Sequence, residues 1–345
     1  MTTGGRRVSC VAFVLGAALL GLVQPVYADR GVLEAVRSRG YVICGVGDGP
    51  KGYSSVSPQG VWSGISVDFC RALAAGVIGI KDAVKFRLVP AEDGFSALQS
   101  GEIDVLSRNI GMTSTRDTSL GVRFPAVLVY DGQGFMVRKS QNITSALELS
   151  GARICVTAES PDEQGLIDYF TGLKMPVELM KFAKWSDAVM AYVNKGCMVL
   201  SADISALAIA RQDLADSADH NILPEMATRH PIGPAVRQGD EEWFGIVRWT
   251  VFALVAAEEL GITAVTIDAA RSSPGSDVRR FLGVDVDLGR SLGLSADWAQ
   301  RIIRQVGNYG DLFDRHFGQK SSLKLERRLN NLSSKGGLHY APPFR

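Results

Sequence analysis

The sequence predicts an α/β protein that folds into two lobes. Apolar runs typical of strands alternate with runs of helical periodicity, and this alternation occurs in two successive rounds. Each round contains a β-rich run that follows a glycine and includes a cysteine, at 41–46 and at 152–156. The 345 residues, 46% of them hydrophobic, are enough for about two domains. Strands that alternate with helices form parallel βαβ units, so we expect two α/β lobes.

The expected elements follow one another along the chain. The first round contains helices at 33–39, 67–78 and 94–100, and strands at 41–46, 85–89, 103–107 and 134–138. The second round contains strands at 152–156 and 198–201 and helices at 162–171 and 185–195. After Gly233 the pattern is mostly helical, at 241–260, 277–282 and 297–306. The run at 241–260 is apolar enough to suggest a membrane span, but Arg248 and Glu258 interrupt it, so we expect a buried globular helix.

The first 28 residues have the pattern of a secretory signal peptide. Arg6 and Arg7 precede an uncharged, mostly apolar run at 8–23, and a small-residue cleavage pattern ends at Ala28. An uncleaved membrane anchor is the alternative, since the run approaches the ~18 residues that a span requires. Cys10 lies inside this leader, which disfavours a lipid anchor. Both alternatives export the rest of the chain, and we expect an exported protein that is cleaved near Ala28.

Cysteine usage fits an oxidising compartment. Without Cys10, four of the five cysteines remain, an even number that allows three pairings. One disulfide per lobe is the most economical choice, which gives Cys44–Cys70 and Cys155–Cys197. A zinc site is disfavoured, because the chain has no C-x-x-C motif and its four histidines are scattered. We therefore expect no metal.

The charge balance and the motifs exclude several classes of function. The chain carries 37 basic and 36 acidic residues without a basic block, which argues against a nucleic-acid binder. The segment 47–52 matches G-x-G-x-x-G, but no helix follows it, so no helix N-terminus is offered to a pyrophosphate. A ligand-contact loop that ends at Tyr53 fits better. No phosphate-binding loop or G-x-S-x-G motif occurs, and we expect neither a cofactor nor catalysis.

One turn is suited to an anion. The expected strand at 103–107 leads into small polar residues that end at Arg116. Backbone N–H groups and a guanidinium can converge there on one carboxylate, which an arginine binds through two parallel hydrogen bonds. The alternative is a solvated arginine in a loop.

The chain resembles the periplasmic solute-binding proteins of ABC transporters, in particular the polar amino-acid family and its general L-amino-acid-binding subfamily. The resemblance spans 29–345, and the stretches that carry it include ALQSGEID (97–104), TSTR (113–116), YDGQGFMV (130–137), GPAVRQGDEEWF (233–244), VGNYG (306–310) and KGGLHYAPP (335–343). It implies the two-lobed, type II-like periplasmic binding protein fold, in which two crossing strands form a hinge near 134–138 and 233–237. Lobe 1 is then discontinuous, comprising 29–134 and 240–345, and lobe 2 comprises 135–239 with the hinge strands.

The resemblance also implies a ligand site. Arg116 takes the α-carboxylate of an amino acid and Asp203 takes its α-ammonium, because a zwitterion needs a fixed cation and a fixed anion in a water-poor cleft. The other expected ligand contacts are Tyr53 as an aromatic cover, Asp48 and Arg108 beside the ligand's side chain, and Asn109, Gly111, Thr113 and Ser160.

This sequence departs from the family at the first helix of lobe 2. A turn of the Gly-Thr-Thr type is usual there, whereas this chain has Glu159-Ser160-Pro161-Asp162-Glu163. Ser160 is expected to cap the helix, with Glu163 completing a capping box. Pro161 removes an N–H donor, and the new carboxylates bring negative charge to an anion site. The ligand is therefore an amino acid held mainly by Arg116, or an amine-bearing molecule for which Glu159 is an extra contact.

The expected function is that of a non-enzymatic, monomeric binding protein that delivers L-amino acids to ABC permease subunits. Two alternatives share the fold. One is a dehydratase-like enzyme with Glu159 as its acid, and the other is a sensory module that presents its ligand to a receptor.

Overall fold

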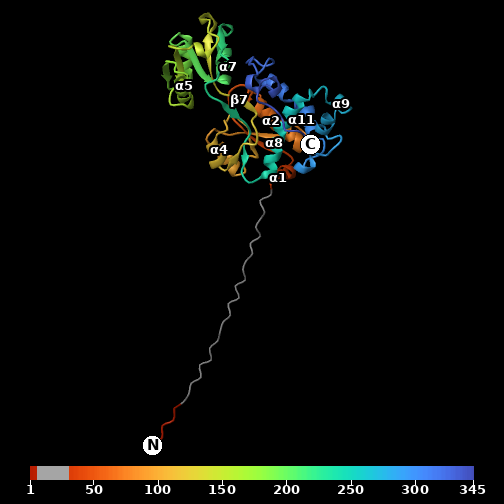
Figure 1. Cartoon of the computed structure of the whole chain (residues 1–345). Coiled ribbons are helices and arrows are strands. Elements are labelled where there is room, and N and C mark those ends of the chain that lie inside the picture. The colour runs from red at the N-terminus through yellow and green to blue at the C-terminus, as the bar shows by residue number, and fades with distance from the viewer. Residues whose placement is uncertain (6–30) are drawn as a thin grey trace. The chain divides into compact units, whose positions relative to one another are not determined.

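The computed structural model describes residues 1–5 and 31–345. The predicted signal peptide therefore lies almost entirely outside the described residues. Residues 31–345 form one compact unit. Within it, the helices α5 (Pro161–Gly172) and α7 (Ile204–Asp213) lie against one sheet, and the helices α2 (Ile65–Val77), α8 (Glu241–Glu259) and α11 (Trp298–Val306) lie together beside another (Figure 1).

Lobe 1 is built on a three-stranded parallel sheet. Its strand order is β4 (Val84–Leu88), β1 (Val42–Val46), β5 (Val105–Leu106). The central strand β1 is rich in β-branched valine and isoleucine and is largely buried, as a strand covered on both faces must be. The disulfide Cys44–Cys70 joins β1 to α2 (Ile65–Val77) and confirms the predicted pairing.

Long helices from the C-terminal third complete the core of lobe 1. The helices α8 (Glu241–Glu259) and α11 (Trp298–Val306) share one hydrophobic cluster with α2. The charges that interrupt α8 are accounted for, because Glu258 pairs with Arg327 and Arg248 lies over the ring of Phe244. No helix within residues 1–5 and 31–345 is long and apolar enough to cross a membrane, as expected for α8.

Lobe 2 is built on a five-stranded mixed sheet. Its strand order is β10 (Glu178–Phe182), β9 (Arg153–Thr157), β11 (Val199–Asp203), β8 (Gln133–Arg138), β12 (His220–Ile222). The first three strands are parallel, whereas β8 is antiparallel to both of its neighbours. The sheet is covered by α5 (Pro161–Gly172), α6 (Trp185–Val193) and α7 (Ile204–Asp213). The second predicted disulfide, Cys155–Cys197, lies in this lobe.

The remaining elements are short. The helices are α1 (Val32–Arg39), α3 (Gly94–Gln99), α4 (Ser114–Ser119), α9 (Ile267–Ala270), α10 (Ser276–Phe281) and α12 (Tyr309–His316). The strands are β2 (Ser55–Val56), β3 (Trp62–Ser63), β6 (Val122–Arg123), β7 (Val129–Asp131), β13 (His230–Ile232) and β14 (Val236–Arg237).

The two passes of the chain between the lobes pair with each other. The strand β7 runs antiparallel to β13, with Tyr130 opposite Pro231. This crossover lies a few residues before the segments expected to cross. The segment at 134–138 is instead part of the lobe 2 sheet as β8, and 236–237 pairs with β6 of lobe 1 as β14. The expected bounds of the lobes, with the return to lobe 1 at residue 240, stay a prediction.

A single buried asparagine ties the C-terminal segment to the crossover. The side chain of Asn330 accepts a hydrogen bond from the Tyr130 N–H at 2.8 Å and donates one to the Tyr130 carbonyl at 2.8 Å. The hydroxyl of Tyr309 donates to the same Oδ1 at 3.2 Å. Because Asn330 satisfies both backbone groups of Tyr130, β7 is fixed to lobe 1 on the side opposite β13.

We expect Asn330→Ala to lower the free energy of unfolding by about 2–3 kcal/mol, since it leaves buried backbone groups of Tyr130 without partners. Urea unfolding followed by circular dichroism measures this loss. Asn331→Ala is the matched control, because the Asn331 side chain forms no hydrogen bond with the described residues. An equal effect of the two substitutions would contradict the role of Asn330.

Candidate functional site

Arg116 lies on the lobe 1 side of the crossover. Thr113 caps α4 and its Oγ1 accepts a hydrogen bond from the Arg116 N–H at 3.3 Å. The guanidinium donates to the carbonyl of Gly111 at 2.7 Å. Gly111 itself bridges to Ile232 of β13, and the Met112 N–H donates to the Pro231 carbonyl at 2.7 Å. Among residues 31–345 no carboxylate pairs with Arg116, so its charge is available to an anion.

Three other predicted contact residues gather at the loop 47–52. The guanidinium of Arg108 lies against Gly47 and donates to the Val89 carbonyl at 2.7 Å, while its Nε is buried and has no hydrogen-bonding partner within residues 1–5 and 31–345. Burial lowers the pKa of Arg108. Asn109 lies beside Gly49, and Asp48 is exposed on the same loop. As expected, this glycine-rich loop does not lead into a helix N-terminus, since the next segments are the short strands β2 and β3.

Tyr53 lies in the interior behind the crossover. Its side chain is 1% exposed, its ring packs edge-on against Phe317, and its hydroxyl donates to Asp131 at 2.9 Å. The structure therefore does not bring Tyr53 to the surface that carries Arg116. Its role as a cover over the ligand stays a prediction.

The start of α5 forms the lobe 2 side. Ser160 caps the helix as predicted: its Oγ accepts from the Glu163 N–H at 3.3 Å and donates to the Thr157 carbonyl at 2.7 Å. The carboxylate of Glu163 bonds the N–H of Glu159 at 2.8 Å, one residue before the cap, and also pairs with Lys181. The side chain of Glu159 is exposed.

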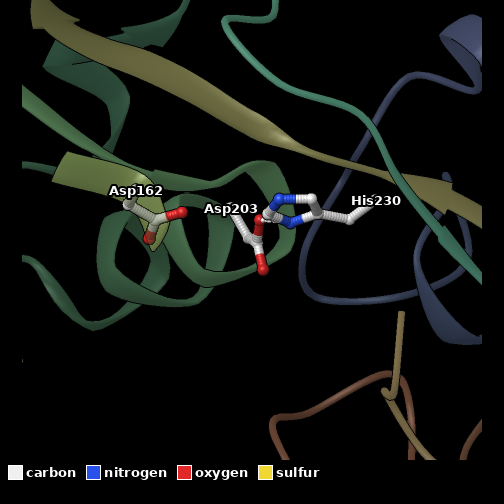
Figure 2. Close-up of side chains that lie close together, drawn as sticks. All are labelled: Asp162, Asp203 and His230. Carbon is white, nitrogen blue, oxygen red and sulfur yellow. Dashed lines mark hydrogen bonds and ion pairs between the residues drawn. The ribbon is translucent and has the colours of Figure 1, made fainter. Parts of the chain in front are cut away.

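Two carboxylates and an imidazole meet at the crossover. Asp162 comes from the first turn of α5, Asp203 from the end of β11 and His230 from β13, and one atom of each lies within 4.8 Å of the others (Figure 2). The Nδ1 of His230 lies 2.7 Å from Asp203 Oδ1, and its Nε2 lies 3.1 Å from Thr228 Oγ1. We refer to Asp162, Asp203 and His230 as the acid–histidine cluster.

The cluster shifts the protonation of its members. Burial and the neighbouring Asp203 raise the pKa of Asp162 to about 6. The hydrogen bond that His230 donates to Asp203 raises the pKa of His230. The negative charges of Asp203, Asp162 and Asp131 act in the same direction. Burial and Asp203 also raise the pKa of Asp131, which lies behind the cluster. The site therefore concentrates negative charge and retains protons near neutral pH.

The cluster has the ligand types of a cation site, but a metal would have to compete with other groups for the imidazole. Both of its ring nitrogens already have hydrogen-bonding partners, so coordination by either nitrogen requires breaking one of these contacts. We assign the cluster to hydrogen bonding and ion pairing.

Comparison with known proteins places the chain in a family. Residues 42–261 match the model of bacterial extracellular solute-binding proteins, family 3. The chain belongs to this family. It is 47% identical over 333 residues to the general L-amino acid-binding periplasmic protein AapJ of Rhizobium johnstonii, an alignment that covers 96% of this chain and 97% of that protein.

Two further relatives of the family 3 protein cover most of its length. It is 42% identical to the glutamate/glutamine/aspartate/asparagine-binding protein BztA of Rhodobacter capsulatus, over 97% of this chain and 99% of that one. A solved periplasmic binding protein of an ABC transporter from Brucella ovis, with glutathione bound, is 44% identical and superposes with a TM-score of 0.78. That comparison covers 91% of this chain and 99% of the solved chain.

Two residues of this family 3 site were not expected from the sequence. His230 precedes a proline outside any predicted element, and Asp131 lies in the quoted stretch 130–137 without an assigned role. Nothing in the local sequence marks either one, because their partners are distant along the chain: 27 residues separate His230 from Asp203 and 78 separate Tyr53 from Asp131.

Asp162 makes the stability of this solute-binding protein depend on pH. The folded protein keeps the Asp162 proton up to a pKa of about 6, whereas the ordinary value is 3.8. The resulting stabilisation is present below pH 3.8 and is lost as the pH rises through 6. We expect Asp162→Asn to raise the free energy of unfolding by about 1–2 kcal/mol at pH 8 and to change it little at pH 4.

Urea titrations at the two pH values measure this difference. Asp168→Asn, at an exposed position of the same helix, is the control and is expected to have little effect at either pH. Equal gains at pH 4 and pH 8 for Asp162→Asn would rule out the ionisation of Asp162 as the cause.

Proposed function

We propose that this protein is the extracytoplasmic substrate-binding component of an ABC importer and that its ligands are L-amino acids. One observation carries the proposal: an arginine that has no carboxylate partner among the described residues and a group of carboxylates are both attached to the same crossover strand. Arg116 connects to β13 through Gly111 and Ile232, and Asp203 connects to it through His230.

A zwitterion is the ligand that such an arrangement suits. The guanidinium offers parallel N–H donors to a carboxylate, while Asp203 and Asp162 offer oxygen acceptors to an ammonium. Because the two groups of charges belong to different lobes, an amino acid that contacts both stabilises the closed arrangement. Hinge closure then follows from the charges of the ligand itself.

The relatives support this choice of ligand class. AapJ is named for general L-amino acids and BztA for glutamate, glutamine, aspartate and asparagine, and both align with nearly the whole chain. We propose the same broad class here, with polar amino acids preferred because Asp48 and Arg108 lie near the loop 47–52. Delivery to permease subunits, a monomeric state and a periplasmic location after cleavage near Ala28 belong to the same proposal.

The enzyme alternative has a different candidate acid from the one expected. Glu159 is exposed, whereas Asp162 has a pKa raised to about 6 and belongs to the cluster. A carboxyl group that keeps its proton near pH 6 is suited to general acid catalysis. Turnover of a cyclohexadienyl acid by the purified protein would favour the dehydratase-like alternative, whereas stoichiometric amino-acid binding without turnover favours the importer.

The test of the amino-acid site is Arg116→Ala. Removing one partner of a desolvated charge pair typically costs about 2–5 kcal/mol, so we expect affinity for L-amino acids to fall about 30-fold or more. Calorimetric titration measures the affinity. Arg116→Lys keeps the charge without the paired donors, and we expect an intermediate loss.

Thermal unfolding separates binding from folding. The helix α4 that carries Arg116 has no buried residue, so we expect replacement of Arg116 to leave the melting temperature within a few degrees of the parent. Arg87→Ala, which removes an arginine exposed on the same lobe, should leave affinity unchanged. A lower melting temperature with unchanged affinity in Arg116→Ala would make Arg116 structural.

A further inference from the structure

The carboxylate proposed to take the ligand's ammonium already has a partner from the protein itself. The Nδ1 of His230 lies 2.7 Å from Asp203 Oδ1, the distance of a charge-assisted hydrogen bond. Asp203 is about one-third exposed and His230 slightly less so, which means that both groups reach solvent and a ligand. An incoming ammonium therefore competes with the imidazole of His230 for Asp203 Oδ1.

The charged groups around His230 are mostly negative. Asp203 faces it from the end of β11, Asp162 from α5 and Asp131 from β7, and Tyr53 donates its hydroxyl to Asp131. At the start of α5 the carboxylate of Glu163 is paired with Lys181. Two cations belong to the same region: Arg229, which precedes His230 in the chain and is exposed, and Arg116, which is linked to β13 through Gly111. These carboxylates favour a protonated His230, consistent with its raised pKa.

A second observation in the same region is a buried side-chain oxygen, on Gln133, that accepts no hydrogen bond from the described residues. Gln133 lies opposite Asp203 in the β8–β11 ladder, so the two side chains share a face of the sheet. Its side chain is fully buried, its Nε2 donates to Ser201, and its Oε1 has no partner among the described residues. That oxygen faces α5 at Gly165, one turn after Asp162. An acceptor without a donor adds partial negative charge beside the cluster.

We propose that His230 is a built-in cation that occupies the ammonium subsite of the empty protein, and that a ligand's ammonium replaces it by driving its proton into solvent. This inference rests on the proposed function, since it takes Asp203 as the ammonium-binding group. The imidazolium becomes a neutral imidazole, the ligand keeps its own three protons, and one proton leaves for each ligand bound.

The hydrogen bonds of the cluster permit this exchange. A neutral imidazole with its proton on Nδ1 still donates to Asp203, and its Nε2 then accepts from the Thr228 hydroxyl. Loss of the proton therefore breaks no contact of His230. What it removes is the repulsion between an imidazolium and an ammonium that share one carboxylate. Asp162 acts in the same direction, because its ionised form attracts the ammonium more strongly than its protonated form.

The sign of the pH dependence follows. Protons on His230 and Asp162 oppose an ammonium, so affinity is lowest at acidic pH and rises as the pH passes through their raised pKa values. One proton released per ligand corresponds to a tenfold gain in affinity per pH unit within that range. Above it the affinity becomes constant.

Calorimetry on the mature protein tests the exchange. We suggest L-glutamine, L-asparagine and L-leucine as probes, because their side chains do not titrate between pH 6 and 8. Titrations at pH 7 in phosphate and in Tris, whose ionisation enthalpies differ, count the protons released. We expect between half a proton and one proton per ligand, and an affinity at least tenfold higher at pH 8 than at pH 6.

Variants assign the proton. In His230→Gln, which has an amide in place of the titrating ring, we expect affinity at pH 6 to rise towards its pH 8 value and proton release to fall by at least half. Asp162→Asn should keep the release that comes from His230. The matched control is His220→Gln, which removes another histidine of lobe 2 that pairs with an aspartate. It should behave as the parent protein.

Three results would overturn the inference. Tight amino-acid binding with no proton release and constant affinity from pH 6 to 8 refutes it while leaving the proposed function intact. Release that persists in His230→Gln but disappears in Asp162→Asn assigns the proton to Asp162 instead. If none of the twenty common L-amino acids binds the parent protein at pH 8, the proposed function itself fails. The proton count of the parent protein decides the question even if a variant does not fold.

Discussion

The antiparallel pairing of β7 with β13 is the contact on which the rest of the site depends. Each strand is three residues long, yet the pair carries the chain into lobe 2 and back. Through Ile232 and Pro231 it holds the turn that presents Arg116, and through His230 it reaches Asp203. Asn330 holds the other side of β7 by bonding both backbone groups of Tyr130. A displacement of this ladder would therefore move the cationic and anionic sides of the site together.

The crossover brings several carboxyl groups together, and the fold alone does not require this excess of negative charge. Three carboxyl groups lie close together: those of Asp131, which is buried, Asp162, which is half-buried, and Asp203, which is partly exposed. Because burial disfavours ionised groups, each additional negative charge there raises the free energy of the folded protein. The structure limits this cost by retaining protons and by placing a basic ring among the carboxylates. Elsewhere a buried acid is managed differently: burial opposes the ionisation of Asp68, but His316, Arg315 and Arg71 hold its pKa well below the ordinary value. Positive groups compensate the buried acid in the core fully, whereas the acids at the crossover are compensated only in part, which supports the proposal that the crossover binds a ligand.

Sequence patterns predicted the elements whose signal is local. Strands β1 and β9 are runs of β-branched residues, α8 has a long apolar periodicity, Ser160 has the residue type of a helix cap, and one disulfide per lobe was the simplest pairing. The elements that escaped prediction lack such signals. The edge strand β10 mixes polar and apolar residues, and α7 follows β11 with no turn residue between them. The direction of β8 and the pairing of Asp203 with His230 depend on the path of the whole chain through the crossover, which no short window of sequence records.

The C-terminal segment that follows α12 links the lobes a third time, next to the crossing strand β7 that Asn330 holds. Arg328 donates to the carbonyls of Ile222 and Leu223, and Arg211 of α7 donates to the carbonyl of Leu323. These three hydrogen bonds join lobe 2 to residues that follow the crossover by about a hundred positions. A rotation of lobe 2 about the crossing strands therefore has to preserve or break them, so the C-terminal segment resists such a rotation in addition to the two strands.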